Sequence, residues 1–302
     1  MNKFGYACIN MELSKKDITT NRSMIRRTFD QKGISYASDL ALKNCTDLNK
    51  ILQWNHKNNI LFFRLSSNLF PWSSEYELEQ LKDYSEISNQ LSIAGAFAKK
   101  VGMRITAHPG PFNKLCSSDD GILSNTIKDL RTHGEVFDLM GLDRTPYYKM
   151  NIHVGASYGD KESTADVFCK NFEKLPDSVS KRLTVENDDK ESLFSTKDLV
   201  NMVSKKIGIP IVHDQHHHGF CPGGLSQLDA MQLAFATWKD ITPVIHYSES
   251  KSEESNDKRI KPQAHSNLII RKIQTYGLKT DVMIEAKFKE IALQKYIKEF
   301  ES

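Results

Sequence analysis

The sequence predicts an α/β fold, a (β/α)8 TIM barrel formed by a single domain over residues 1–302. Short runs rich in β-branched and aromatic residues alternate with longer segments of helical periodicity, which indicates βαβ units and a parallel sheet. Eight such units favour a closed barrel, and 302 residues is an ordinary length for one. No Gly-rich phosphate loop follows any run, which argues against a doubly wound sheet with a nucleotide cofactor.

The eight predicted strands are short and lie along the whole chain. They comprise residues 4–9, 60–65, 103–107, 148–154, 182–185, 209–212, 242–245 and 280–284. The predicted helices comprise residues 45–57, 78–100, 122–142, 226–238, 267–276 and 286–300. The clearest is 78–100, where the apolar spacing makes one face from Leu78, Leu81, Ile87, Leu91, Ala94 and Ala98. The mixed-charge run 248–261 is predicted to be a solvated loop.

Composition is that of an ordinary soluble globular protein, with 39% hydrophobic and 26% charged residues. No run approaches the roughly 20 apolar residues of a membrane span, and no secretory signal is evident. We therefore expect an intracellular, soluble protein with no membrane partner. Five scattered cysteines without a C-x-x-C pair argue against disulfides and zinc fingers. A net charge of +3 means that any DNA binding must be local or carried by bound cations.

A histidine or a carboxylate stands at the end of each predicted strand from the third to the eighth. In order, these residues are His108, His153, Glu186, Asp214, His246 and Glu285. Parallel strands of a barrel end at one rim, where this fold builds its active sites. A lone histidine at such a position is more often structural, but carboxylates grouped on one rim repel one another unless cations neutralise them. The set therefore predicts a cluster of divalent metals.

Other histidines fall into two groups. Those next to the predicted strand ends are further candidate ligands, and they are His216, His217, His218 and His265. His56 and His133 lie on predicted helices and are expected to be structural. Imidazole and carboxylate without thiolate suit zinc, manganese or iron. Two or three ions sharing a carboxylate suit phosphodiester hydrolysis, but the same site could serve an isomerase or epimerase that abstracts a proton beside a carbonyl.

Nine motifs resemble, in order and spacing, the UV-damage endonuclease family, which is related to endonuclease IV. They are GYACIN, FFRLSSNLFPW, TAHPGPFN, IHVG, LTVENDD, HDQHHH, IHYS, AHS and DVMIEAKFKE, and they span nearly the whole chain. The resemblance implies a metal-dependent phosphodiesterase of DNA repair. It would nick damaged double-stranded DNA immediately 5′ to cyclobutane dimers and 6-4 photoproducts, with abasic sites as a further candidate, by attack of metal-activated hydroxide.

The resemblance also implies two or three divalent metal ions, with manganese favoured over zinc, magnesium or cobalt. Glu186, Asp214, His246 and Glu285 match the ligands of one metal, and Glu186 would bridge to a second metal held by His108 and His153. His217 and His265 match the third site. Glu186 and Glu285 are the expected catalytic residues. We expect a monomer.

The chain departs from the family pattern at four places. Glu75 replaces a histidine and is either a carboxylate ligand or the cap of the next helix. Val244 replaces a lysine that can be carboxylated, so that modification cannot occur there. Gln263 replaces an aspartate of the endonuclease IV relatives, which would weaken the third site. Pro111 and Phe112 replace a Gln-Tyr pair that probes the duplex, and Phe112 can still act as an apolar wedge.

DNA contacts are expected elsewhere as well. Tyr6 and Asn10 match residues that contact DNA near the lesion, although a half-buried barrel tyrosine is the alternative for Tyr6. Candidate phosphate contacts are Lys114, Lys251, Lys258, Arg259 and Lys287. The four departures also raise the alternative of a damage-binding protein without catalysis, although the intact carboxylates at the strand ends count against it.

Overall fold

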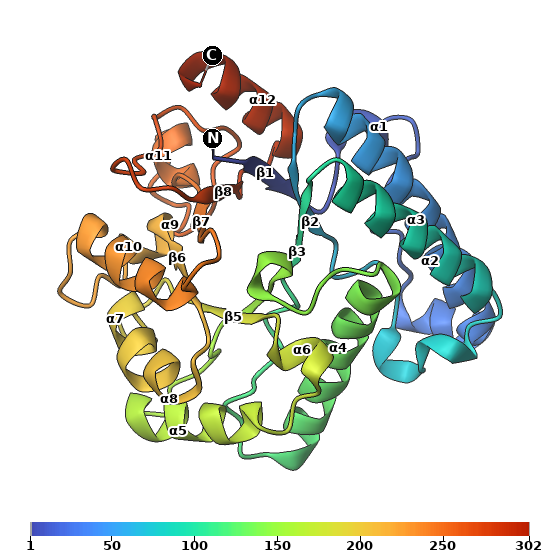
Figure 1. Ribbon diagram of the computed structural model, residues 1–302, viewed down its shortest axis with the longest axis horizontal. Helices are drawn as coiled ribbons and strands as arrows, with labels where there is room; N and C mark the ends of the chain where they lie inside the picture. Colours follow the sequence, from blue (N-terminus) through green and yellow to red (C-terminus); the bar gives the residue numbers. More distant parts are fainter. Residues whose placement is uncertain (1, 302) are drawn as a thin grey trace.

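The computed structural model describes residues 2–301, which form a closed barrel of eight parallel strands in sequence order (Figure 1). The strands are β1 (Phe4–Ala7), β2 (Phe62–Leu65), β3 (Arg104–Ala107), β4 (Met150–Ile152), β5 (Leu183–Glu186), β6 (Ile211–Asp214), β7 (Val244–Tyr247) and β8 (Asp281–Ile284). β1 pairs with β8 and closes the barrel. Each predicted strand overlaps one of these, so the predicted (β/α)8 fold is confirmed.

Helices surround the barrel (Figure 1). The longer ones are α2 (Arg26–Lys57), α3 (Tyr84–Lys100), α4 (Asp120–Leu139), α5 (Lys161–Phe172), α10 (Gln227–Phe235) and α12 (Lys289–Phe300). Between β5 and β6, α7 (Thr196–Leu199) continues through a π-helical turn (Val200–Ser204) into α8 (Lys205–Ile207). The short helices are α1 (Met11–Ser14), α6 (Asp177–Ser180), α9 (Gln215–His218) and α11 (Lys251–Ser255). No helix within residues 2–301 is long and apolar enough to cross a membrane.

Two predicted helix boundaries are wrong. The helix predicted over 78–100 begins only at Tyr84, because Leu78–Gln80 forms a separate 3-10 turn that Glu77 and Gln80 close with reciprocal side-chain hydrogen bonds. The first crossover helix is far longer than the predicted 45–57. It begins at Arg26 and bends at Gly33, whose φ of 65° lies in the left-handed region that glycine adopts freely.

The predictions for the segment before β8 are also wrong. Residues 267–276 form no helix, and the predicted loop 248–261 contains α11. Two carboxylates explain the difference. Glu254 accepts hydrogen bonds from the backbone N–H groups of Asn267 and Leu268, and Glu249 accepts them from Ile270 and Arg271. Side chains therefore satisfy the amides that a helix would have used, while the apolar residues of the segment still reach the core.

The barrel interior is layered because alternate residues of each strand point inward. At the N-terminal end, buried Arg104 pairs with Asp281 at 2.9 Å and donates to the carbonyl of Thr242 at 2.9 Å. An apolar layer contains Phe62, Val244 and Met283. The C-terminal end is polar instead. An ion pair therefore closes the barrel at its N-terminal end, and the polar side chains lie at the open C-terminal end.

Candidate metal centre

The six residues predicted at strand ends do converge on the C-terminal rim. Glu186 and Asp214 are the last residues of β5 and β6, and His246 lies within β7. The other three directly follow β3, β4 and β8, and they are His108, His153 and Glu285. His217 joins them from α9, which begins immediately after β6.

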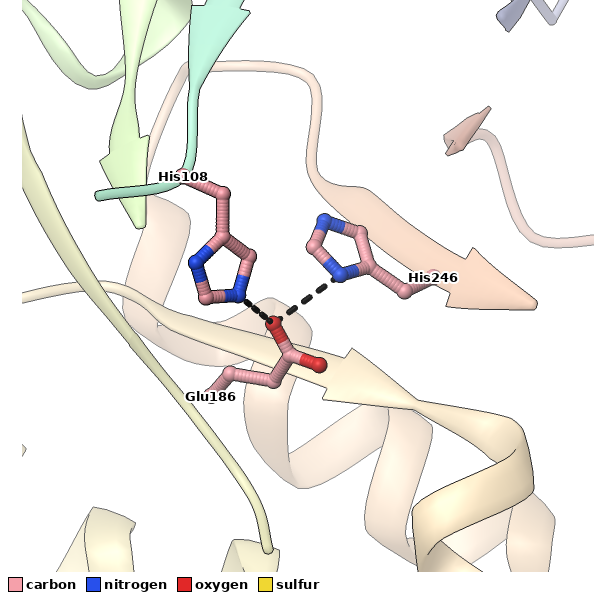
Figure 2. A group of neighbouring side chains, drawn as sticks. All are labelled: His108, Glu186 and His246. Atoms are coloured by element: carbon pink, nitrogen blue, oxygen red, sulfur yellow. Dashed lines mark ion pairs between the residues drawn. The ribbon is translucent and has the colours of Figure 1, made fainter. Parts of the chain in front are cut away.

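These side chains form three groups whose ligand atoms lie within 4.8 Å of one another. The groups are His108 with Glu186 and His246; His153 with Glu186 and His217; and Asp214 with His246 and Glu285. Glu186 belongs to two groups and so does His246, so the three potential ion sites are adjacent. Figure 2 shows the first group, in which both imidazoles point at the same carboxylate oxygen.

Glu186 directs its two oxygens at different histidines. Its Oε2 lies 2.9 Å from His246 Nδ1 and 3.3 Å from His108 Nε2. Its Oε1 lies 3.4 Å from His217 Nδ1 and 4.0 Å from His153 Nε2. This division is what a carboxylate bridging two cations requires.

The polar atoms left over in the site fit a divalent cation. Asp214 uses Oδ1 to cap α9 by accepting from the His217 N–H at 2.7 Å, which leaves its buried Oδ2 without a hydrogen-bond partner. His246 Nδ1 is also buried and makes no well-formed hydrogen bond, although carboxylate oxygens of Glu186 and Glu285 lie 2.9 and 3.0 Å away. Buried polar atoms are seldom left unpaired, and oxygen and imidazole nitrogen together suit first-row divalent metals.

The charges in the site agree with this interpretation. Burial alone would raise the pKa of Glu186, but His246 and His153 outweigh burial and hold that pKa well below its usual value. Burial would also raise the pKa of Glu285, but Arg64 and His246 outweigh burial and hold that pKa well below its usual value. Burial lowers the pKa of His108 to about 4, so its imidazole is neutral and free to bind a metal. The carboxylates stay ionised and need cations around them.

Two predicted ligands, His265 and Glu75, lie in none of the three groups found within residues 2–301. His265 is close by, with Nδ1 3.7 Å from Glu285 Oε2 and its ring 6.3 Å from that of His217. Glu75 instead pairs with Arg26 at 2.9 Å. Nor does it cap the 3-10 turn Leu78–Gln80 that follows, because Glu77 is the residue at that cap.

Comparison with known proteins decides the family. The chain matches the family described as UV-endonuclease UvdE over residues 2–302. It belongs to this family. A UV-damage endonuclease of Schizosaccharomyces pombe is 34% identical over 99% of this chain, which spans 51% of that relative. A UV DNA damage endonuclease of Bacillus cereus is 32% identical over 99% of this chain and 95% of the relative.

Solved structures agree with the UvdE assignment. The crystal structure of SacUVDE matches with a TM-score of 0.84 at 33% identity, over 99% of this chain and 97% of that one. A 3-keto-D-glucoside 4-epimerase of E. coli has a TM-score of 0.54 at 11% identity, over 99% and 97%, which shows the barrel fold alone. The resemblance inferred from the motifs is confirmed, and membership of UvdE makes the chain a DNA repair endonuclease.

Several residues that orient the candidate metal ligands were not predicted from the sequence. Asn151 donates to Glu186 and accepts from Thr184 at 2.8 Å, and Arg64 pairs with Glu285. Asp188 lies 3.3 Å from His153 Nδ1. Strand alternation could have found Asn151, because it stands two residues before His153 and therefore points to the same side. Such partners fix the orientation of metal-binding side chains.

Lys149 orients His246 from within the barrel. It is fully buried immediately before β4, and its Nζ lies 3.1 Å from His246 Nε2, so the other ring nitrogen faces Glu186 and Glu285. Burial lowers the pKa of Lys149 to about 7. Val244, where the family pattern has a lysine, lies in the inner apolar layer. The polar partner of His246 thus comes from the residue that precedes β4 and not from its own strand.

The predicted DNA-contacting residues divide into buried and exposed pairs. Tyr6 and Asn10 are fully buried, and the Tyr6 hydroxyl donates to Asn55 at 2.7 Å and accepts from Asn10 at 2.9 Å. Asn10 also caps α1. In this conformation neither side chain reaches the surface, and their hydrogen bonds connect the end of β1 to α2 and α1. Pro111 and Phe112 lie in the exposed loop after β3, where the Phe112 side chain is 64% exposed.

Metal affinity is expected to fall as the pH falls. Burial opposes protonation of His153 and His217, but nearby carboxylates outweigh it and raise their pKa to about 9 and about 8. Below pH 8 an ion that uses both imidazoles must displace two protons, so its apparent dissociation constant should rise about 100-fold per pH unit between pH 8 and 6. Manganese titration calorimetry checks this, with His133→Gln as a control. A constant affinity over that range would contradict it.

Lys149→Met is expected to weaken metal binding about 10- to 100-fold, because His246 loses the contact that fixes its ring. Removing a buried ammonium should leave the melting temperature unchanged or raise it. Metal content after dialysis and thermal unfolding of the metal-free protein are the two measurements. A fall in melting temperature with unchanged metal affinity would mean that Lys149 is merely structural.

Proposed function

We propose that this UvdE-family chain nicks double-stranded DNA immediately 5′ to ultraviolet photoproducts, both cyclobutane dimers and 6-4 photoproducts, and leaves 3′-hydroxyl and 5′-phosphate ends. One observation carries the proposal. The buried carboxylate of Glu186 is shared by two of three adjacent metal-binding groups at the open rim of the barrel. Abasic sites are a further candidate substrate, since they also weaken the duplex locally.

The groups would hold two or three divalent ions, of which manganese suits the mixed oxygen and nitrogen ligands. Such ions activate an attacking water and neutralise charge on the phosphate oxygens. Side chains of the protein itself hold the candidate metal ligands in position. Glu186 and His246 would each serve two of the neighbouring ligand groups, and Arg64 keeps Glu285 ionised and oriented toward His246. We assign the catalytic role to Glu186 and Glu285 on this basis, with His265 as an outer ligand of the third site.

Lesion recognition would use distortion and not base sequence. Extruding a damaged base pair costs less than extruding an intact one. Phe112 is the side chain placed to fill the gap, because it is an exposed apolar ring on the loop that directly follows the metal-binding His108. The enzyme would act as a monomer inside the cell, wherever its DNA lies.

The rival functions have less support. A sugar isomerase shares the barrel, but the epimerases that resemble this chain do so in fold alone at 8 to 13% identity. A damage-binding protein without catalysis would not need the complete set of three ligand groups.

Nicking of supercoiled plasmid tests the proposal. With manganese, irradiated plasmid should be nicked and untreated plasmid should not, and a chelator should abolish the reaction. Glu186→Gln should lower the rate more than about 100-fold because two ligand groups lose a shared oxygen. Glu173→Gln, on the surface at the end of α5, should match the wild type.

A synthetic duplex with one cyclobutane dimer then locates the cut. The proposal requires a single nick on the 5′ side of the dimer, with a 3′ end that a polymerase can extend. Equal nicking of untreated DNA would contradict damage specificity. Binding of irradiated duplex without any nick would favour the non-catalytic alternative.

Phe112→Ala is expected to lower kcat/KM on dimer-containing duplex about 10-fold or more, because an aromatic stack on a base contributes about 1–3 kcal/mol. Hydrolysis of a small phosphodiester, which needs no lesion, should not change. Tyr158→Ala is a matched control, since Tyr158 is a comparably exposed aromatic residue on the loop after β4. If both variants lose the same activity, or neither does, Phe112 is not the probe.

A further inference from the structure

A basic pocket lies on the rim beside the metal centre, between the β1–α1 loop and the loop that joins β8 to α12. It has a volume of about 460 Å³ and is lined by Ile9, Met11, Ser14, Lys15, Lys287 and Lys289. α1 and α12 pack against each other, and residues in or next to these two helices provide most of its lining. Three lysine side chains and apolar residues therefore line the same hollow.

These three lysines lack acidic partners. Among residues 2–301, no carboxylate forms an ion pair with Lys15, Lys287 or Lys289. Two of the rim cations expected to contact phosphate are neutralised instead, since Lys251 pairs with Glu254 at 2.7 Å and Arg259 with Asp257 at 2.8 Å. The pocket is thus a place on the rim where positive charge is left uncompensated.

Two nearby carboxylates are committed elsewhere. Glu285 pairs with Arg64, and Glu290 is fully buried, where its Oε1 accepts the Glu12 N–H at 2.8 Å. That hydrogen bond ties the start of α1 to the start of α12. The backbone N–H groups of Lys287 and Phe288 donate to the carbonyls of Ser266 and Asn267 at 2.9 and 3.1 Å. The pocket walls are therefore held before any ligand arrives, which lowers the entropic cost of binding.

The position of the pocket indicates the ligand. Lys287 stands two residues after Glu285, and the charge of Lys289 interacts with both Glu285 and Arg64. The pocket therefore adjoins the ligand group formed by Asp214, His246 and Glu285. The hollow beside His108 and His153, by contrast, is lined by Asp188 and Asp189. A polyanion laid across the rim would meet the metals in the middle and positive side chains on the β1 and β8 side.

We propose that Lys15, Lys287 and Lys289 bind backbone phosphates of DNA that flank the cleavage site. The proposal deepens the proposed function and rests on it for the choice of DNA as the polyanion. Phosphate contacts position a duplex without reading its bases, so the pocket should hold intact and damaged DNA equally well. It would supply the local charge that the small net charge of the chain cannot.

The salt dependence of binding to an undamaged duplex tests the pocket directly. Each phosphate contact adds about 0.9 to the slope of log affinity against log salt concentration, because bound counterions are released. Lys287→Gln with Lys289→Gln should therefore reduce the slope by about 1.8, and Lys15→Gln alone by about 0.9. Lys279→Gln removes the same charge from the loop before β8, at the opposite end of that strand, and should leave the slope unchanged.

Fluorescence anisotropy with the metal-loaded protein between 50 and 200 mM salt gives these slopes. The same variants should bind dimer-containing and undamaged duplexes more weakly by the same factor, while metal content stays at the wild-type level. An unchanged slope in the Lys287→Gln Lys289→Gln variant would overturn the proposal. So would a loss confined to the damaged duplex, or an equal loss in Lys279→Gln. Undamaged DNA needs no nicking, so the result is independent of whether the proposed cleavage occurs.

Discussion

The buried carboxylate of Glu186 is the constraint on which the rest of the site depends. It has only 1% of its side chain exposed and lies among His108, His153, His217 and His246. A buried negative charge destabilises a fold unless opposite charge and hydrogen bonds surround it. The four histidines come from four different strand ends or the helix after one, so the barrel must close correctly before this charge is compensated. Closure of the barrel therefore also brings the candidate metal ligands together.

The same constraint explains the polar layer beneath the rim. Arg64 on β2, Lys149 just before β4 and Asn151 on β4 contact Glu285, His246 and Glu186 respectively. Arg64 offsets the charge of Glu285, and the three side chains together fix the orientation of the imidazole ring and of the two carboxylates. The apolar layer with Phe62 and Val244 then separates this polar layer from the Arg104–Asp281 pair at the other end.

Strand positions and the side chains that gather at the strand ends were predictable because both follow from local pattern. A run of β-branched residues fixes a strand, and a parallel barrel fixes where its end lies, so His108 and Glu285 could be placed together although 177 residues apart. What failed depended on distant partners. The segment 267–276 has helical spacing but gives its amides to Glu249 and Glu254. Tyr6 and Asn10 looked accessible at a strand end until Asn55 of α2 was seen to pair with the tyrosine. Neither contact leaves a periodic signal in the sequence.

The distribution of charge bears on how a protein with a net charge of only +3 can handle a polyanion. Strong uniform basicity would hold undamaged DNA as tightly as damaged DNA and leave little free energy for discrimination. Here ions bound at the proposed metal centre and the lysine pocket beside it would supply positive charge locally, while Asp188 and Asp189 line the hollow beside His108 and His153. Backbone attraction would then position the cleaved strand, and the acidic hollow would resist the approach of an ordinary, well-stacked duplex. Under the proposed function, only a duplex that opens easily would pass its backbone over the metals, so the ease of opening, and not the identity of the bases, would be the property that is selected.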